Sequence, residues 1–110
     1  MDLNDYQQKA HNTSLKTSVK GDKILYPVLG LCGESGEIAE KFKKMYRDKN
    51  GEVDDVFKTE VIKELGDVMW YIAELCTVLN VELSTVAEKN IEKLYSRKDR
   101  GQLHGNGDNR

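Results

Sequence analysis

The sequence predicts an all-α protein: a helical bundle of about four helices, completed by homo-oligomerisation. Apolar residues recur at three- and four-residue steps over long stretches, which is the period of an amphipathic helix. Strand-like alternation is absent over any useful length, and the only proline is Pro27. The apolar stripes are too broad for a lone monomer of 110 residues, whose small core oligomerisation would supplement.

The first helix is expected to begin near Asn4. Asn4 and Gln7 have the spacing of a capping box, in which two side chains satisfy the free N–H groups of a first turn. Residues 12–22 are mostly polar and include Gly21, so we expect them to contain a loop.

The second helix is expected to begin near Pro27, because proline suits a first helical turn. It should end within residues 47–51, where arginine, aspartate, lysine, asparagine and glycine follow one another. Asp54 or Asp55 could cap the third helix. This helix should run to about Leu79, and it is the most apolar of the four.

The fourth helix is expected to start from Ser84 or Thr85, with Glu88 completing a capping box from Thr85. Its apolar periodicity stops near residue 100. We therefore assign residues 1–100 to one domain and residues 101–110 to a flexible, glycine-rich C-terminal tail.

Composition and charge exclude several classes of function. The net charge of −2 gives no basic field, so we expect no nucleic-acid polymer and no anionic membrane as partner. Cys32 and Cys76 belong to no metal-binding motif, and we expect both to be small buried hydrophobes. No segment resembles a signal peptide or a membrane span, so a cytoplasmic location is expected.

Two acidic pairs are the most informative feature of the chain. Glu34 and Glu37 form one pair, and Glu64 and Asp67 form the other, each with i, i+3 spacing. On a helix this spacing places both carboxylates on one face, about 5–6 Å apart at Cβ. Two such helices side by side would bring four carboxylates together, and they would repel one another without cations. An oxygen-only ligand set suits Mg²⁺, with Mn²⁺ as a possible substitute.

A plainer interpretation exists for any single acidic pair, since acids mostly lie on solvated helix faces. We interpret five other glutamates in this way: Glu40, Glu74, Glu82, Glu88 and Glu92. Glu64 and Asp67 differ from these glutamates, because they belong to a stripe that borders the apolar face of their helix. A di-iron site is disfavoured, because neither pair contains the Glu-x-x-His motif.

The pattern Glu34-x-x-Glu37, 26 intervening residues and then Glu64-x-x-Asp67 resembles that of MazG-like all-α nucleoside triphosphate pyrophosphohydrolases. The segments LYPVLGLCGESGEIAEKFKK, KELGDVMWYIAELC and EKNIEKLYSRKDRG resemble the two metal helices and the last helix of that family. The closing GNGDNR resembles the end of small stand-alone members, including phage-type ones. The resemblance covers roughly residues 24–110.

This resemblance implies hydrolysis of a nucleoside triphosphate between its α- and β-phosphates, giving the monophosphate and pyrophosphate. It implies Mg²⁺ dependence, a homodimer or homotetramer, and a role in nucleotide-pool control or house-cleaning. The family's metal ligands carry over to Glu34, Glu37, Glu64 and Asp67. We expect Glu34 or Glu37 to act also as the catalytic base, and the sequence leaves that choice open.

Candidate substrate-binding residues surround these acids. Lys41 follows Glu37 by four residues, so both lie on one helix face. Asn90, Lys93 and Arg97 form a stripe on the last helix, which the resemblance places near the triphosphate and which is otherwise a solvated basic face.

An aromatic wall would serve the sugar or base. Tyr71 lies one turn after Asp67 and is the main candidate. Trp70 could serve too, although core packing is the more usual role of a tryptophan there, and Tyr26 is a weaker candidate. Base and sugar preference stay open. The alternative functions are a non-catalytic nucleotide- or metal-binding regulator and a helical interaction module.

Overall fold

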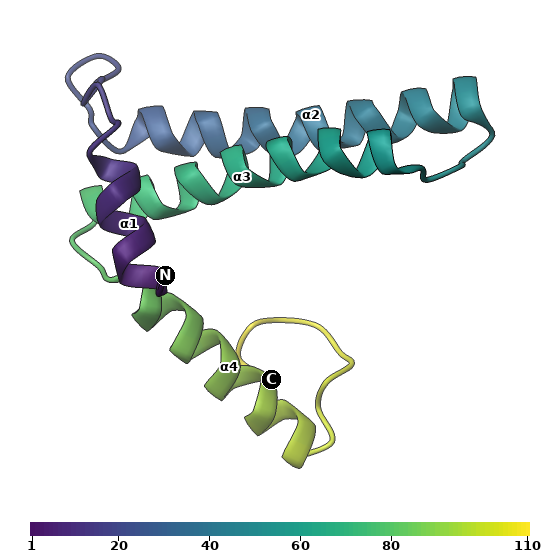
Figure 1. Ribbon diagram of the computed structural model, residues 1–110. Coiled ribbons are helices and arrows are strands. Elements are labelled where there is room, and N and C mark those ends of the chain that lie inside the picture. The colour runs from purple at the N-terminus through teal and green to yellow at the C-terminus, as the bar shows by residue number, and fades with distance from the viewer.

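The computed structural model describes all 110 residues and contains four helices and no strand (Figure 1). The helices are α1 (Leu3–His11), α2 (Leu25–Lys49), α3 (Asp55–Val78) and α4 (Leu83–Asp99). The prediction of an all-α chain with about four helices is therefore confirmed. None of these helices combines the length and the apolar character that crossing a bilayer requires.

Helices α2 and α3 form a long antiparallel pair. Asp54 caps α3: its carboxylate accepts a 2.8 Å hydrogen bond from the backbone N–H of Phe57. Asp54 is one of the two residues that the sequence predicted as this cap. Helix α2 begins at Leu25, slightly before the predicted Pro27. It ends at Lys49, and the next residue, Asn50, adopts the left-handed conformation with φ 52° and lets the chain turn.

Helix α1 is capped by Asp2 and not by the predicted box of Asn4 and Gln7. The Asp2 carboxylate accepts a 2.8 Å hydrogen bond from the N–H of Asp5. Asp2 wins because it lies one residue before the first helical turn, where its side chain reaches the free N–H groups. The prediction of the helix was right, and the prediction of its cap was wrong.

The amides of Asn4 and Gln7 instead cap α4. The N–H of Ser84 donates to Asn4 Oδ1 at 3.1 Å, and the N–H of Leu83 donates to Gln7 Oε1 at 2.7 Å. Helix α4 therefore needs no cap of its own, and none of its own side chains bonds its first turn. The predicted start at Ser84 or Thr85 is wrong for this reason.

The core is small and lies where α1, α3 and the start of α4 meet. Its buried members are Ala10, Ala73, Cys76 and Leu83, with Trp70 packed against them. The prediction that Cys76 is buried is confirmed, whereas Cys32 is exposed on α2 and that expectation was wrong. Only eight of 110 residues are buried in all, so most apolar side chains remain at the surface.

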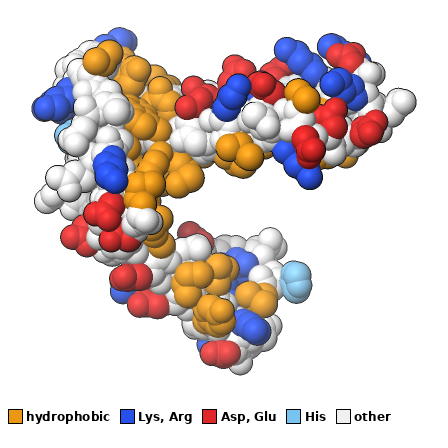
Figure 2. All heavy atoms as spheres, viewed as in Figure 1, with side chains coloured by type: hydrophobic (Ala, Val, Ile, Leu, Met, Phe, Trp, Pro, Cys, Tyr) orange, Lys and Arg blue, Asp and Glu red, His pale blue; other side chains and the backbone are white.

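The chain has an open shape. Figure 1 shows the α2–α3 pair as one arm and α4 as a second arm that leaves the junction at α1. The radius of gyration is 17.0 Å, against about 13 Å for a compact domain of this length. Figure 2 shows apolar side chains gathered at the junction of the arms and along α4.

Candidate metal centre

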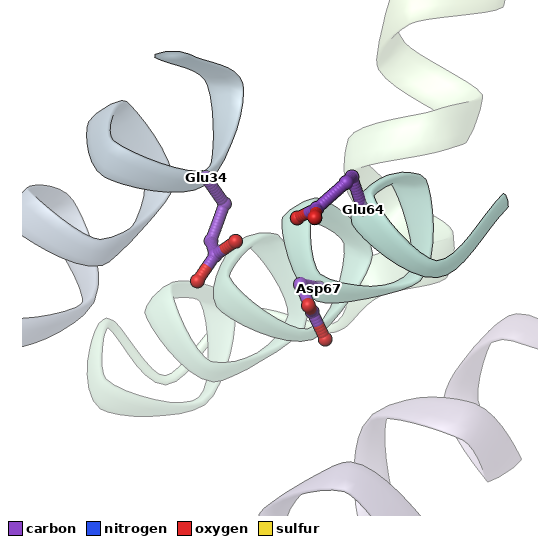
Figure 3. A group of neighbouring side chains, drawn as sticks. All are labelled: Glu34, Glu64 and Asp67. Carbon is purple, nitrogen blue, oxygen red and sulfur yellow. The ribbon is translucent and has the colours of Figure 1, made fainter. Parts of the chain in front are cut away.

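Three of the four predicted metal ligands meet between α2 and α3. Glu34 projects from α2 and Glu64 and Asp67 project from α3, and the carboxylates of Glu34 and Glu64 turn toward each other (Figure 3). One carboxylate oxygen of each residue lies within 4.8 Å of those of the other two. A cation placed among them would find oxygen ligands from both helices, which is the donor chemistry that Mg²⁺ and Mn²⁺ prefer.

Electrostatics show that these carboxylates are crowded. The pKa of Glu34 is raised above its ordinary value, first by burial and then by the negative charge of Asp67 and a hydrogen bond with Glu64. A carboxyl group with a raised pKa is one whose charge is poorly compensated by its surroundings. Divalent cation binding would supply the missing compensation, so the residues fit a hard metal ion.

Glu37 does not join this group. It lies one turn after Glu34 on α2 and is exposed to solvent. The sequence reasoning treated the two acids of each pair alike, because both share one helix face. The structure separates them: Glu34 projects toward α3, whereas Glu37 is exposed to solvent.

Lys41 crosses from α2 to the acidic stripe of α3. Its Nζ lies 3.5 Å from a carboxylate oxygen of Glu64 and 3.7 Å from one of Glu60. Lys41 thus offsets part of the negative charge beside the cluster. Lys41 remains a candidate for phosphate binding, and in this structure its ammonium group forms ion pairs with these two carboxylates.

Tyr71 lies one turn after Asp67, against the backbone of α2. A Cβ atom at Gly30 would overlap the Tyr71 ring, so glycine at this position lets the ring lie flush with α2. The pKa of Tyr71 is raised by burial, by a hydrogen bond with Tyr26 and by the charges of Glu34 and Asp67. The predicted aromatic wall therefore lies next to the acidic cluster.

Trp70 and Tyr26 take different positions around Tyr71. The ring of Trp70 meets that of Tyr71 edge to face with centroids 5.0 Å apart, and its Nε1–H donates to Thr13 Oγ1 at 2.8 Å. Trp70 also packs against the core, which is the structural role that the sequence favoured for it. The Tyr26 ring centroid lies 6.2 Å from that of Tyr71.

The three predicted substrate residues on α4 are not brought to the carboxylates of the same chain. Helix α4 forms the second arm and diverges from α2 and α3 (Figure 1). Asn90 is exposed on that arm. Lys93 and Arg97 instead bind Asp108 of the tail, at 3.2 Å and 3.3 Å from its carboxylate oxygen.

Arg97 is only 5% exposed, because residues 101–110 fold back over it. Its guanidinium donates to the backbone oxygen of Asp108 at 2.7 Å. Hydrogen bonds from Lys93 and Arg97 lower the pKa of Asp108. The two cations thus share one carboxylate of their own chain.

Sequence reasoning missed one acidic residue. Glu74 was interpreted as a solvated glutamate, yet it is 4% exposed. One of its oxygens lies 2.8 Å from His11 Nδ1, and the other is buried without a hydrogen-bond partner. The available signal was its position, because Asp67, Tyr71 and Glu74 continue one stripe at steps of four and three residues.

Comparison with known proteins gives a consistent result. The family model described as "MazG nucleotide pyrophosphohydrolase domain" matches residues 25–101, which include all four acids of the two pairs. The chain is also 46% identical over 116 aligned positions to the "Gene 37 protein" of Mycobacterium phage L5, and the alignment covers all of both proteins. No solved structure gives a significant match.

Proposed function

The chain belongs to the MazG nucleotide pyrophosphohydrolase family, and from this membership we propose that it hydrolyses nucleoside triphosphates between the α- and β-phosphates. The products are a nucleoside monophosphate and pyrophosphate, and the role is nucleotide-pool control or house-cleaning. One observation carries the proposal: carboxylates of Glu34, Glu64 and Asp67 from two helices lie within 4.8 Å of one another. The recognition of the family from its acidic motifs is confirmed.

Glu34, Glu64 and Asp67 would hold Mg²⁺, and Mn²⁺ could replace it. The chemistry that the bound cation supplies is neutralisation of phosphate oxygens and activation of water. Lys41 keeps the carboxylate of Glu64 oriented through its 3.5 Å ion pair. Reorientation of Lys41 toward a phosphate would exchange one anionic partner for another.

Glu37 is our candidate for the catalytic base. Its carboxylate is not one of the three clustered ones and is exposed to solvent, and it lies one turn from Glu34 on α2, so we assign to it the proton of the attacking water. A water oxygen would attack the α-phosphorus while the bond from that phosphorus to the bridging oxygen breaks. The pyrophosphate would leave with the bonding electron pair, and the water proton would pass to Glu37.

We also propose that a second copy of the chain completes the enzyme. The surface area of 8144 Å² is about 2,000 Å² larger than that of a compact monomer of this size. Much of the excess is apolar: Leu29, Ile62 and Ile91 are each more than half exposed. A permanent dimer interface of that size is common, and it would give α4 of one copy access to the carboxylates of the other.

Product analysis tests the proposed reaction. The protein is incubated with ribo- and deoxynucleoside triphosphates and Mg²⁺, and the phosphorus products are separated. Monophosphate and pyrophosphate from a subset of the panel are expected. Diphosphate and orthophosphate would show cleavage at the wrong bond, and the absence of turnover in a folded sample would favour a nucleotide-binding regulator.

A further inference from the structure

A cavity of about 330 Å³ lies beside the acidic cluster without including any of its residues. It is bounded by the end of α1, the segment that follows it, the first turn of α2 and the last turns of α3. Its walls include His11, Lys16, Lys23, Tyr26, Glu74 and Thr77. Its size falls within the range of small-molecule sites.

Glu74 gives this cavity an unused hydrogen-bond acceptor. The side chain is 5% exposed, and its Oε1 accepts a 2.8 Å hydrogen bond from the Nδ1–H of His11. Its Oε2 is buried and has no partner in the chain. Buried polar atoms nearly always have partners, and an orphaned carboxylate oxygen is costly. A ligand that brings an N–H group into the cavity would remove that cost.

The two lysines of the cavity do not neutralise this oxygen. Lys16 and Lys23 are exposed, and neither makes an ion pair with Glu74. The cavity therefore combines a buried acceptor with cationic donors nearer to solvent. Such a combination fits a polar, flat ligand with a donor at its inner end and acceptors at its outer edge.

The cavity and the acidic cluster lie along the same stripe of α3. Glu74 follows Asp67 by seven residues on the same stripe of α3, about 10 Å along the helix axis. Between them lies Tyr71, whose ring centroid is 6.2 Å from that of Tyr26, a residue of the cavity wall. A nucleotide with its phosphates at the carboxylates can span this distance with its sugar beside the tyrosines.

Resting on the proposed function, we infer that this cavity receives the nucleobase and that Glu74 selects bases with an exocyclic amino group. Cytosine and adenine offer the Oε2 atom an N–H donor, as glutamate accepts from the cytosine amino group elsewhere. Uracil and hypoxanthine place a carbonyl oxygen at the same position of the ring. That oxygen would face the carboxylate with lone pairs only, so the two acceptors would repel each other.

Two substrate pairs test this hydrogen bond. The deoxynucleoside triphosphates of cytosine and uracil differ at the amino position and at the adjacent ring nitrogen, which carries a hydrogen only in uracil, and those of adenine and hypoxanthine differ in the same way. We expect kcat/KM to favour the amino member of each pair by at least about tenfold. Equal kcat/KM values within both pairs would overturn the inference.

Glu74→Gln tests the residue itself. The glutamine oxygen can still accept from His11, while its NH₂ group replaces the acceptor Oε2 with a donor. The preference within each pair should therefore fall at least about tenfold or reverse. Glu88→Gln is the matched control, because it removes the same charge from an exposed position on α4 and should leave the preference unchanged.

A second variant covers the case in which Glu74→Gln does not fold. Glu74→Asp retains the charge but withdraws both oxygens by one methylene, so it should lower kcat/KM for cytosine and adenine substrates more than for uracil and hypoxanthine ones. An unchanged preference in the folded variant, either Glu74→Gln or Glu74→Asp, would overturn the role of Glu74.

Binding separates this inference from the proposed reaction. Calorimetry with deoxycytidine and deoxyuridine monophosphates in EDTA measures base selection without hydrolysis. Tighter binding of the cytidine compound by wild type, lost in Glu74→Gln, would support the cavity even if no triphosphate is turned over. Binding of neither compound, or of both equally, would overturn the inference whatever the outcome of product analysis.

Discussion

The two arms of this chain differ in whether they bring their candidate site residues together. The α2–α3 arm brings Glu34, Glu64 and Asp67 together within a single chain. The α4 arm carries the basic residues Lys93 and Arg97, but it directs them to its own tail. The acidic cluster is therefore formed by the pairing of two neighbouring helices, whereas Lys93 and Arg97 would reach a triphosphate held there only from a second copy of the chain, as we propose.

The largest expected effect comes from changing Glu34, on the α2–α3 arm. Glu34→Gln removes a ligand atom and should lower kcat about 10²–10³-fold, as the loss of one group that stabilises transition-state charge does elsewhere. In EDTA the same variant should unfold at a higher temperature than wild type, because it removes a charge that burial and the neighbouring carboxylates disfavour, as the raised pKa of Glu34 indicates. The added stability that Mg²⁺ gives the wild type should be lost.

Glu37→Gln provides the comparison on the same helix face. As a proton acceptor outside the cluster, Glu37 should affect kcat about 10²-fold or more while the melting temperature still rises with Mg²⁺. Calorimetric melts with and without Mg²⁺ distinguish the two variants. Loss of the Mg²⁺ response in Glu37→Gln would make Glu37 a metal ligand, and full activity would remove it from the site.

The next effect concerns assembly of the chain through the α4 arm. Ile91 is 51% exposed on α4, and Ile91→Lys should convert an oligomer to monomer because each copy loses an apolar contact worth about 1.5–3 kcal/mol. Glu92→Lys also places a lysine on α4, at an exposed position that pairs only with Lys89 at 3.3 Å, and should leave assembly intact. Sedimentation velocity at micromolar concentration reports both. A monomeric wild type would contradict the proposal of a second copy.

The contrast between the arms explains what the sequence could and could not predict. Glu34, Glu64 and Asp67 could be found because i, i+3 spacing fixes a helix face and a short turn pairs the two helices. The cap that Asn4 and Gln7 give to α4 could not be found, because its partners lie about eighty residues apart in the chain. Propensity rules describe a helix terminus by its own neighbours and not by a distant side chain.

Glu74 illustrates the same limit in the site. Its charge predicts exposure, while its burial depends on where His11 of α1 packs against α3. The stripe that leads from Asp67 through Tyr71 to Glu74 was visible in the sequence. What the sequence lacked was the position of α1, which turns a solvated edge of α3 into the wall of a cavity.

A pair of glycines on α2 gives a smaller effect. Gly30→Ala places a Cβ atom into the Tyr71 ring and should cost about 1–3 kcal/mol of unfolding free energy through overpacking. Gly33→Ala meets no atom within 4 Å and should add up to about 1 kcal/mol, because alanine favours the helix. Urea unfolding measures both. A destabilising Gly33→Ala would show that a second copy covers this side of α2.

The smallest effect is the pH dependence of stability without metal. Because the pKa of Glu34 is raised in the folded chain, the folded state holds its proton more tightly than the unfolded state, and this residue's contribution to stability increases as pH falls from above the folded pKa toward the unfolded value. Asp108 acts in the opposite direction. Its pKa is lowered, so its contribution is present above the unfolded value and is lost as pH falls through the folded one.

Comparing wild type with Glu34→Gln in EDTA separates the contribution of Glu34 from that of Asp108. The stability advantage of the variant should be largest above the raised pKa of the folded chain and should shrink as pH falls through that pKa and wild-type Glu34 takes up its proton. Urea unfolding at a series of pH values measures the difference, and Asp108 cancels because both proteins carry it. A stability advantage that is constant with pH would mean that ionisation of Glu34 does not destabilise the folded chain. The proximity of the three carboxylates would then have no effect on the free energy of unfolding.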